Sequence, residues 1–317
     1  MTSGSMQCIV CEGACRHAHS WTRAELCVAF EAKVGKPFPA DTECPDYTMW
    51  ACESCGLEFP DPVIPGDAAF YGWITTMPNY YKSHRWEWDE TAGLAQAVQA
   101  TTLLDVGCGT GVFLDFMRSK SATTKTVGLD TLAESVEACR AKGHEAVCST
   151  LEAFVEAGDA PGFDMVTAFH CLEHVTDPVG LIRSMSSAAR PGGRVVVSVP
   201  LSPPSWEVMG RDCLNMPPHH LTRWTAESLR QLGKVCHMKV QLTSDNGAML
   251  DSIPKSVLWL FRETAGISAS ASWSHAAVGM AKRPDVLVKC AAFLLKRERT
   301  DDGRPVGNTA LAVFTRG

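Results

Sequence analysis

Four cysteines near the N-terminus stand in two CxxC pairs, Cys8 with Cys11 and Cys52 with Cys55. This spacing lets two thiolates on one tight turn occupy adjacent corners of a zinc tetrahedron, and Gly56 permits the left-handed turn that the second pair needs. The alternative is a group of buried cysteines without metal. Because four thiolates would close the coordination sphere, we predict a structural Zn²⁺ that stabilises a segment too small to build its own core.

A glycine-rich turn follows a buried strand in the segment "TTLLDVGCGTGVFLDFM", and an apolar-periodic helix follows the turn. The glycines of the turn are Gly107, Gly109 and Gly111. Asp105 ends the strand, and Asp130 ends a second strand, "TVGLD", where a βαβ unit places a carboxylate that accepts hydrogen bonds from ribose hydroxyls. A dinucleotide fingerprint would need glycine in place of Val112, so the turn alone is weak evidence. Helix capping is the alternative role for both aspartates.

The stretch "MPPHHLTRWT" presents two adjacent histidines, His219 and His220, ahead of a helix that Thr225 should cap. Neutral imidazoles beside a rigid Pro-Pro turn suit proton transfer or metal binding, and capping of a loop is the simpler alternative. Adjacent side chains of an extended loop point to opposite sides, so we expect one histidine to reach a pocket and the other to anchor the loop. Arg223 and Trp224 either shape that pocket as substrate contacts or pack.

An aromatic-rich run, "FYGWITTMPNYYKSHRWEW", precedes the glycine turn. Tyr80, Tyr81 and His84 combine aromatic rings with polar tips, so they predict a lid that contacts a substrate. Packing against the following domain is the alternative, and we prefer that role for Trp86 and Trp88.

From residue 101 onward, strand and helix patterns alternate, which predicts an α/β fold with a doubly wound, mostly parallel sheet. We divide the chain into a zinc-binding module at 1–62, a helical and aromatic lid and linker at 63–100, and the α/β domain at 101–317. Helices at about 250–300 would be inserted before the last strand. The apolar spacing of "VLVKCAAFLLK" in this insertion suits packing on the domain or a homodimer surface.

The segments "LLDVGCGTG", "VGLD", "FDMVTAFHCLEHVTDP" and "ARPGGRVVVSVP", in this order, resemble class I S-adenosylmethionine-dependent methyltransferases over about residues 100–245. The resemblance implies a Rossmann-like, seven-stranded sheet whose last strand, "NTALAVFTR", runs antiparallel. It also implies S-adenosylmethionine as the cofactor. By this resemblance, the residues that bind the cofactor are Asp105, Gly107, Gly109, Gly111, Asp130, Leu151, Glu152 and His170.

The same resemblance locates candidates for catalysis. His170, Glu173 and His174 follow the fourth strand, whose C-terminal end faces the cofactor methyl group in this family, and stabilisation of the turn is their alternative role. The loop with His219 and His220 leaves the fifth strand, where the family forms its acceptor pocket. One of these two histidines is therefore predicted to be the general base that deprotonates an acceptor hydroxyl.

Charge and composition exclude several classes of partner. Residues 1–100 hold 6 Lys/Arg and 13 Asp/Glu, a net charge of −7, whereas residues 101–317 hold 23 and 22, a net charge of +1. An acidic front half argues against nucleic acid, because phosphate affinity depends on cationic side chains. The sequence contains neither an apolar run of about 18 residues nor a secretory signal, and its 14 cysteines indicate reduced thiols. We therefore expect a cytoplasmic protein without a membrane span.

Together these features predict a methyltransferase that moves a methyl group from S-adenosylmethionine to a small-molecule or sugar acceptor at a hydroxyl oxygen. Sugar C-methylation is an alternative, because such enzymes also pair an N-terminal zinc module with this fold. Methylation of rRNA is a second alternative, against which the missing Asn/Asp-Pro-Pro-aromatic motif and the charge of residues 1–100 speak. A third is a non-catalytic cofactor-binding protein that docks a partner, which the intact glycine turn and Asp130 disfavour.

Overall fold

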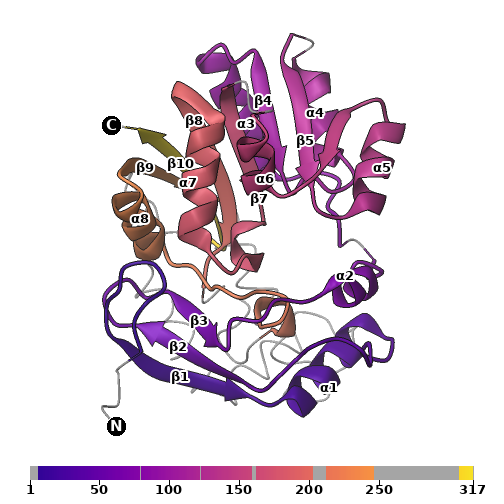
Figure 1. Ribbon diagram of the computed structural model, residues 1–317, viewed down its shortest axis with the longest axis vertical. Coiled ribbons are helices and arrows are strands. Elements are labelled where there is room, and N and C mark those ends of the chain that lie inside the picture. Colours follow the sequence, from indigo (N-terminus) through magenta and orange to yellow (C-terminus); the bar gives the residue numbers. More distant parts are fainter. Residues whose placement is uncertain are drawn as a thin grey trace, which may run out of the picture.

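The computed structural model places an N-terminal module beside a larger α/β domain (Figure 1). The residues that the structure describes are 6–78, 80–121, 123–158, 162–202, 212–245 and 307–316. The helical insertion predicted at about 250–300 lies outside these residues, and its suggested homodimer surface stays a prediction. Within the described ranges, no helix has both the length and the apolar character needed to cross a membrane.

The N-terminal module is an antiparallel three-stranded sheet in the order β1-β2-β3, with one helix beside it. Its elements are β1 (Cys15–Trp21), α1 (Arg23–Val34), β2 (Tyr47–Cys52) and β3 (Glu58–Asp61). The hydroxyl of Thr22 accepts a hydrogen bond from the backbone N–H of Glu25, and the Glu25 carboxylate accepts one from the N–H of Thr22. This reciprocal capping fixes the start of α1, and Gly35 ends it at a φ of 75°.

The α/β domain is built on a seven-stranded sheet in the order β6-β5-β4-β7-β8-β10-β9. Its strands are β4 (Thr102–Val106), β5 (Lys125–Asp130), β6 (Glu145–Cys148), β7 (Phe163–Phe169), β8 (Ala189–Pro200), β9 (Met238–Ser244) and β10 (Thr309–Arg316). The first five pair in parallel, whereas β10 runs antiparallel to both of its neighbours. The predicted seven-stranded, mostly parallel sheet with an antiparallel last strand is therefore confirmed.

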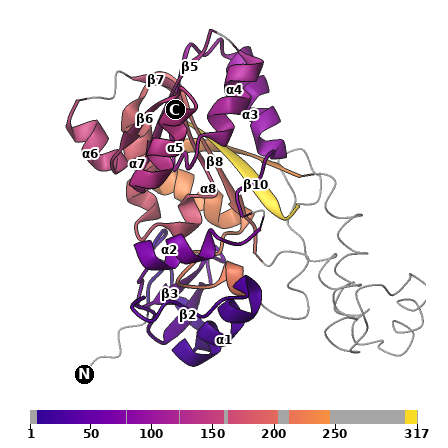
Figure 2. The ribbon, with the colours of Figure 1, turned by 90° about the vertical axis from the view of Figure 1, so that its right-hand side faces the viewer.

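Helices cover both faces of this sheet, because alternate residues of each strand point to opposite sides. They are α3 (Trp86–Ala97), α4 (Val112–Lys120), α5 (Ala133–Ala141), α6 (Leu151–Glu156), α7 (Pro178–Ala188) and α8 (Ala226–Val235). Val166 and Val197 belong to one buried cluster, with α6, α7 and α8. Their neighbours Met165 and Val196 belong to the other, with α3, α4 and α5. Figure 2 shows α3 and α4 on the opposite side of the sheet from α6 and α7.

The segment between the two parts divides its packing between them. Helix α2 (Ala68–Ile74) packs in the N-terminal module, where the Phe70 ring meets the Phe30 ring edge-on at 5.4 Å between centroids. Helix α3 packs on the large sheet through Trp88. We therefore propose that the lid and linker predicted at 63–100 divides near residues 75–85, and is not a part of its own.

The stretch that carries the paired histidines also joins the two parts. The backbones of Glu58 and Arg223 exchange two hydrogen bonds, of 3.1 and 2.9 Å. Trp224 forms an isolated β-bridge with Leu201, the residue that follows β8. Thr225 caps α8, as predicted, and its hydroxyl donates to the carbonyl oxygen of Cys55 at 2.8 Å. One extended segment is thus attached to the cysteine knuckle, to the sheet and to a helix.

Candidate active site

The glycine turn lies at the C-terminal end of β4, in the middle of the sheet. Gly107, Gly109 and Gly111 all have positive φ, of 74°, 53° and 76°, a conformation that a side chain disfavours. A Cβ atom on Gly111 would lie 2.6 Å from the Sγ of Cys139, so close packing of α5 also requires glycine there. The N–H group of Gly107 donates to the carbonyl oxygen of Leu129 at 2.7 Å, which ties the turn to the end of β5.

Asp130 ends β5 and holds the glycine turn from the side. Its Oδ2 accepts a hydrogen bond from the N–H of Gly109, and its Oδ1 accepts one from the N–H of Leu132, both at 2.9 Å. A carboxylate offers about four lone-pair sites, so these two bonds leave acceptor capacity for other donors. Asp130 can therefore shape the turn and also accept ribose hydroxyls, and the capping role does not exclude the binding role.

Asp105 lies under the turn, with only 3% of its surface exposed. The Thr167 hydroxyl donates to its Oδ1 at 2.7 Å. Burial raises the pKa of Asp105 from 3.8 to about 7, because the ionised carboxylate is poorly solvated there. A buried carboxyl at this place is costly for the fold, which favours a role in binding.

Replacing this carboxyl by an amide should stabilise the ligand-free protein. The unfolded state releases the Asp105 proton near pH 3.8 and the folded state near pH 7. Stability therefore falls as pH rises through this window, and the penalty is fully present above it. We expect Asp105→Asn to raise the melting temperature at about pH 8 and to change it little near pH 4. Thermal denaturation at both pH values checks this, and equal effects at the two would contradict it.

The segment predicted to contact adenine begins α6. Thr150 caps this helix by accepting a hydrogen bond from the N–H of Ala153 at 3.2 Å. Leu151 is 3% exposed and belongs to the core, whereas Glu152 is exposed in the first helical turn. The adenine contact of both residues stays a prediction, and Glu152 is the one with an accessible side chain.

His170 follows β7 and is enclosed by charged groups. Its Nε2 lies 3.1 Å from the Glu87 carboxylate and 2.9 Å from a guanidinium nitrogen of Arg85. Its Nδ1 lies 3.2 Å from the Glu173 carboxylate, which is fully buried. Burial lowers the pKa of His170, but the adjacent carboxylates of Glu173 and Glu87 outweigh that effect and raise it above the ordinary value. His170 thus joins α3 to the turn after β7, and its catalytic role and that of Glu173 stay predictions.

His174, His219 and His220 form a cluster beside this turn, which we call the histidine cluster. The rings of His219 and His220 stack at 4.5 Å between centroids with 16° between their planes, and each lies 4.8 Å from the His174 ring. The expectation that the adjacent histidines point to opposite sides is therefore wrong. Their backbone is not extended, because the N–H groups of both donate to the carbonyl oxygen of Met216.

The histidine cluster is largely shielded from water. His219 is 5% exposed, and burial lowers its pKa to about 3. Burial likewise lowers the pKa values of His174 and His220. All three rings are accordingly neutral near pH 7, each with one nitrogen that bears a lone pair.

Two tyrosines of the predicted lid link the histidine cluster to the glycine turn. The Tyr80 hydroxyl lies 3.0 Å from His219 Nε2. The Tyr81 ring covers Gly109 so closely that a Cβ atom added to this glycine would lie 3.4 Å from the ring. The rings of Tyr80 and Tyr81 meet edge-on. His84 instead pairs with Asp89 at 2.8 Å on an exposed face. The contacts of Tyr80 and Tyr81 fit the lid prediction. The contacts of His84 do not support it.

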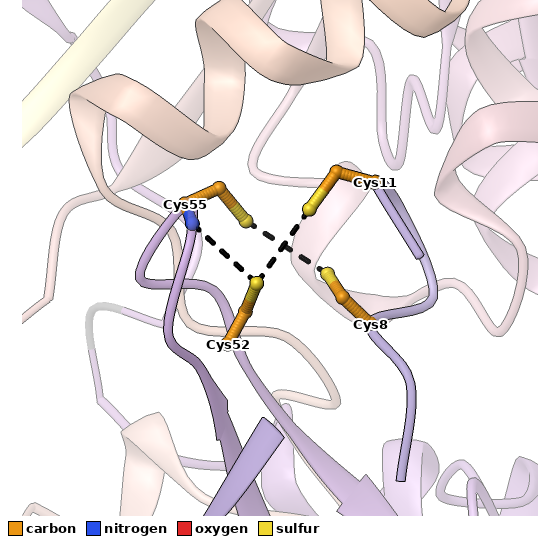
Figure 3. A group of neighbouring side chains, drawn as sticks. All are labelled: Cys8, Cys11, Cys52 and Cys55. Atoms are coloured by element: carbon orange, nitrogen blue, oxygen red, sulfur yellow. Dashed lines mark hydrogen bonds between the residues drawn. The ribbon is translucent and has the colours of Figure 1, made fainter. Parts of the chain in front are cut away.

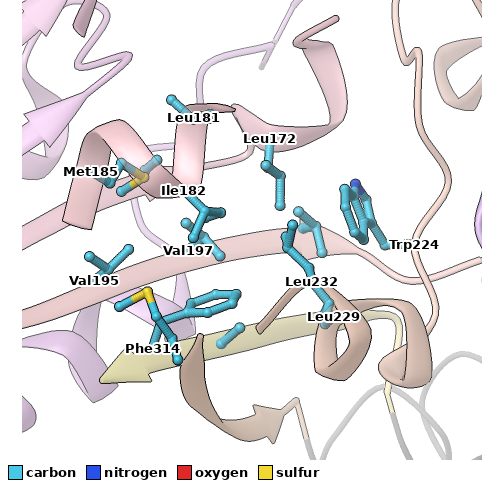
Figure 4. Close-up of a cluster of buried hydrophobic side chains, with 14 of the residues drawn as sticks. Leu172, Leu181, Ile182, Met185, Val195, Val197, Trp224, Leu229, Leu232 and Phe314 are labelled. Carbon is cyan, nitrogen blue, oxygen red and sulfur yellow. The ribbon is translucent and has the colours of Figure 1, made fainter. Parts of the chain in front are cut away.

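Arg223 and Trp224 lie in the interior, and the substrate contacts predicted for them stay predictions. The Arg223 side chain is 3% exposed and forms an ion pair with Glu58 at 2.9 Å. Trp224 is fully buried and lies beside Leu172 and Leu229 in the core (Figure 4). Their burial is compatible with packing, the alternative role that the sequence left open.

The four cysteines of the two CxxC pairs converge, as their spacing predicts (Figure 3). Cys8 Sγ lies 3.8 Å from Cys55 Sγ, and Cys11 Sγ lies 3.5 Å from Cys52 Sγ. A zinc tetrahedron with Zn–S bonds of about 2.3 Å would separate its sulfurs by about 3.8 Å. The cluster therefore has the donor set and the size of a Cys₄ zinc site.

Sequence reasoning missed the residues that orient the site histidines. Tyr71 lies 3.1 Å from His174 Nδ1, and Asn215 Oδ1 lies 3.0 Å from His220 Nδ1. Arg85 and Glu87 contact His170, as described above. The signal available for Arg85 and Glu87 was their position as charged residues among the tryptophans of "SHRWEW". Tyr71 belongs to the same aromatic-rich run as Tyr80 and Tyr81, whereas Asn215 had no such signal.

Comparisons with known proteins agree with this arrangement. The family described as "Methyltransferase domain" matches residues 81–235. The chain is similar to the ubiquinone biosynthesis O-methyltransferases of Vibrio parahaemolyticus, 38% identical over 102 residues, and Methylococcus capsulatus, 33% identical over 135 residues. These matches cover 30% and 37% of this chain and 42% and 56% of the relatives. The chain thus spans about half the length of the curated relatives it matches.

Among solved structures, a SAM-dependent methyltransferase from Archaeoglobus fulgidus is 14% identical with a TM-score of 0.45, over 72% of this chain and 94% of that one. The plantazolicin methyltransferase BamL is 12% identical with a TM-score of 0.46, over 73% of this chain and 84% of that one. The family match includes the glycine turn, Asp130 and the histidine cluster. By this match, residues 81–235 form a methyltransferase domain.

Proposed function

We propose that the protein transfers a methyl group from S-adenosylmethionine to a hydroxyl oxygen of a small-molecule acceptor. The observation that carries this proposal is the glycine turn at the end of β4, fixed by Asp130, within the segment that matches the methyltransferase family. The curated relatives named as O-methyltransferases support oxygen as the site of methylation. They do not extend over the whole chain, so the acceptor itself is proposed only by its chemical class.

The cofactor would lie across the C-terminal ends of β4 and β5. Gly107 and Gly109 lack side chains, so the backbone can approach the cofactor closely, and Asp130 would accept hydrogen bonds from the ribose. Asp105 would orient the amino group of the methionine part, and Glu152 would lie near the adenine. When bound, S-adenosylmethionine supplies an electrophilic methyl group on a sulfonium sulfur.

The histidine cluster would form the acceptor side of the site. Its three rings come from the turn after β7 and the loop after β8, and so lie beyond the C-terminal ends of these strands, where ligands bind in such sheets. A histidine would accept the proton of the acceptor hydroxyl while the O–C bond forms and the C–S bond breaks. Tyr80 and Tyr81, which contact the cluster and the glycine turn, would close over the two reactants and align them.

The N-terminal module would hold a structural Zn²⁺ through Cys8, Cys11, Cys52 and Cys55. The separations between their sulfurs support this, as does closure of the coordination sphere by four thiolates. Such an ion would stabilise a small sheet that is joined, through Cys55 and Thr225, to the segment that carries His219 and His220.

Calorimetry with the Asp130→Ala variant tests the cofactor assignment. We expect about 10- to 100-fold weaker binding of S-adenosylmethionine, because charged hydrogen bonds contribute roughly 1.5–3 kcal/mol. Asp130→Asn is the matched control, since its single carbonyl oxygen keeps part of the acceptor capacity and it should bind with an intermediate affinity. Unchanged affinity in the alanine variant would contradict the assignment.

The acceptor class is tested by incubating the protein with methyl-labelled S-adenosylmethionine and a panel of phenols, sugar nucleotides and ribosomal RNA. We expect label in a small-molecule product whose mass spectrum shows a methyl ether. Label on carbon would favour the sugar C-methylation alternative. Label in RNA alone, or cofactor binding without transfer to any of the acceptors, would refute the proposed function.

A further inference from the structure

The histidine cluster contains a set of nitrogen donors that the proposed proton transfer does not require. One ring nitrogen from each of His174, His219 and His220 lies within 4.8 Å of the other two. General-base catalysis needs one such nitrogen. Three imidazoles that converge from two separate segments of the chain therefore call for a further explanation.

Hydrogen bonds fix which nitrogen of each ring carries the proton. The Nδ1 of His174 lies 2.5 Å from the carbonyl oxygen of His219, and the Nδ1 of His219 lies 2.7 Å from that of Leu214. The Nδ1 of His220 lies 3.0 Å from the amide oxygen of Asn215. Carbonyl oxygens only accept, so each Nδ1 carries the hydrogen and donates it. All three Nε2 atoms consequently bear a lone pair.

This pattern is the one that metal-binding histidines show, because an N–H group bonded to a carbonyl fixes the tautomer and orients the ring toward the metal. The Tyr80 hydroxyl can donate to the lone pair of His219 Nε2, at 3.0 Å. Among the described residues, no hydrogen-bond donor contacts the Nε2 atoms of His174 and His220. Lone pairs on neighbouring rings repel one another, and a cation bound between the rings would remove that repulsion.

The surroundings favour a positive charge. Glu173 is fully buried next to His174, and within the described ranges neither of its carboxylate oxygens has a hydrogen-bond partner. Its ion pair with His170 is 3.2 Å long. A buried carboxylate that is only partly compensated lowers the energy of a cation nearby.

We propose that His174, His219 and His220 bind a divalent transition-metal ion, of which zinc is the expected occupant, through their Nε2 atoms. Neutral imidazoles suit zinc, copper, iron and nickel, whereas magnesium and calcium require oxygen ligands. With Zn–N bonds of about 2.0–2.1 Å, tetrahedral ligands lie about 3.3 Å apart, so ring rotations that shorten the present separations would complete the site.

Three protein ligands leave one position of a tetrahedron open, which is the arrangement of catalytic zinc sites. If the proposed function holds, the acceptor hydroxyl takes this position. The metal would lower the pKa of that hydroxyl, whose proton would pass to solvent, and its oxygen would then form the new O–C bond as the C–S bond of the cofactor breaks. This role rests on the proposed function, whereas metal binding does not.

Metal analysis of the purified full-length protein tests the site without any assay of activity. We expect two zinc ions per chain, one at the cysteines and one at the histidine cluster, and one ion per chain in His220→Ala. His237→Asn is the control and should retain two, because His237 is exposed and asparagine tolerates its positive φ. One zinc in the wild type, or an unchanged content in His220→Ala, would overturn the proposal.

A milder variant covers the case in which His220→Ala fails to fold. Asn215→Ala removes the carbonyl that holds the His220 ring, and we expect it to weaken metal binding at this site about 10- to 100-fold. Cobalt added to protein with zinc-filled cysteines should give visible absorption without thiolate charge transfer, and the variant should need more cobalt. Equal titrations for variant and wild type would contradict the proposal.

The two proposals fail separately. A protein with one zinc that still methylates a hydroxyl would refute the histidine metal site and leave the proposed function standing, with a histidine as the base. A protein with two zinc ions that transfers no methyl group would refute the proposed function and leave the histidine metal site standing. Asp130→Ala changes the glycine turn and the proposed cofactor site but neither the cysteines nor the histidine cluster, so it should keep both ions.

Discussion

His219→Ala is expected to lower the rate of methyl transfer by about 10²–10⁴-fold while leaving the affinity for S-adenosylmethionine within about twofold. The proposed mechanism assigns His219 to the acceptor side, and none of its contacts involves the glycine turn or Asp130. Single-turnover measurements with saturating cofactor report the rate, and calorimetry reports the affinity. A rate within about threefold of the wild type would contradict this expectation.

His220→Ala should have an effect of similar size. The two rings are stacked in one cluster, so removing either changes the same group of side chains. Strongly unequal losses would instead indicate that one histidine alone reaches the acceptor. His237→Asn should retain the wild-type rate, because His237 is exposed and does not belong to the histidine cluster.

Cys52→Ser is the second change with a large expected effect, on folding. A structural zinc contributes about 10–16 kcal/mol in small zinc-binding peptides, a substantial share of which would be lost with one thiolate. We expect the N-terminal sheet to unfold at temperatures at which the wild type is intact. Limited proteolysis, with cleavage sites mapped to residues 6–61, and zinc analysis measure this.

The same variant should also lose methyl transfer. The carbonyl oxygen of Cys55 accepts the hydrogen bond from Thr225, and Glu58 pairs with Arg223. Loss of the module would therefore release the segment that follows His219 and His220. Cys148→Ser is the control, because Cys148 is exposed and lies outside the cysteine cluster. A folded, zinc-free Cys52→Ser variant with full activity would show that the metal and the module are dispensable.

The central part of the fold could be predicted because its signals are local. The glycines of the turn, the strand ends at Asp105 and Asp130, and the cap at Thr225 each depend on neighbours within a few residues. The four-cysteine cluster was also predictable, because the CxxC spacing limits what each pair can do. In each of these cases the residue type and the local backbone require one another.

The acceptor side could not be predicted to the same extent, since it depends on contacts across the fold. His174 meets His219 across 45 residues of sequence, and Tyr80 meets His219 across 139. A histidine pair in a loop gives no indication of its third member. The burial of Trp224 could not be predicted for a similar reason, because it depends on Leu172 and α8, which its own local sequence does not reveal.

The order of the strands affects how this chain folds while it is being synthesised on the ribosome. Strand β10 lies between β8 and β9 in the sheet, yet 64 residues separate the end of β9 from its start. Until β10 has been made, β8 has an open edge and β9 has no strand to pair with. At roughly 5–20 residues per second, synthesis of residues 245–316 takes about 4–14 s. During that interval the nascent chain exposes unpaired apolar strands, which makes it a substrate for chaperones and a hazard for aggregation on polysomes.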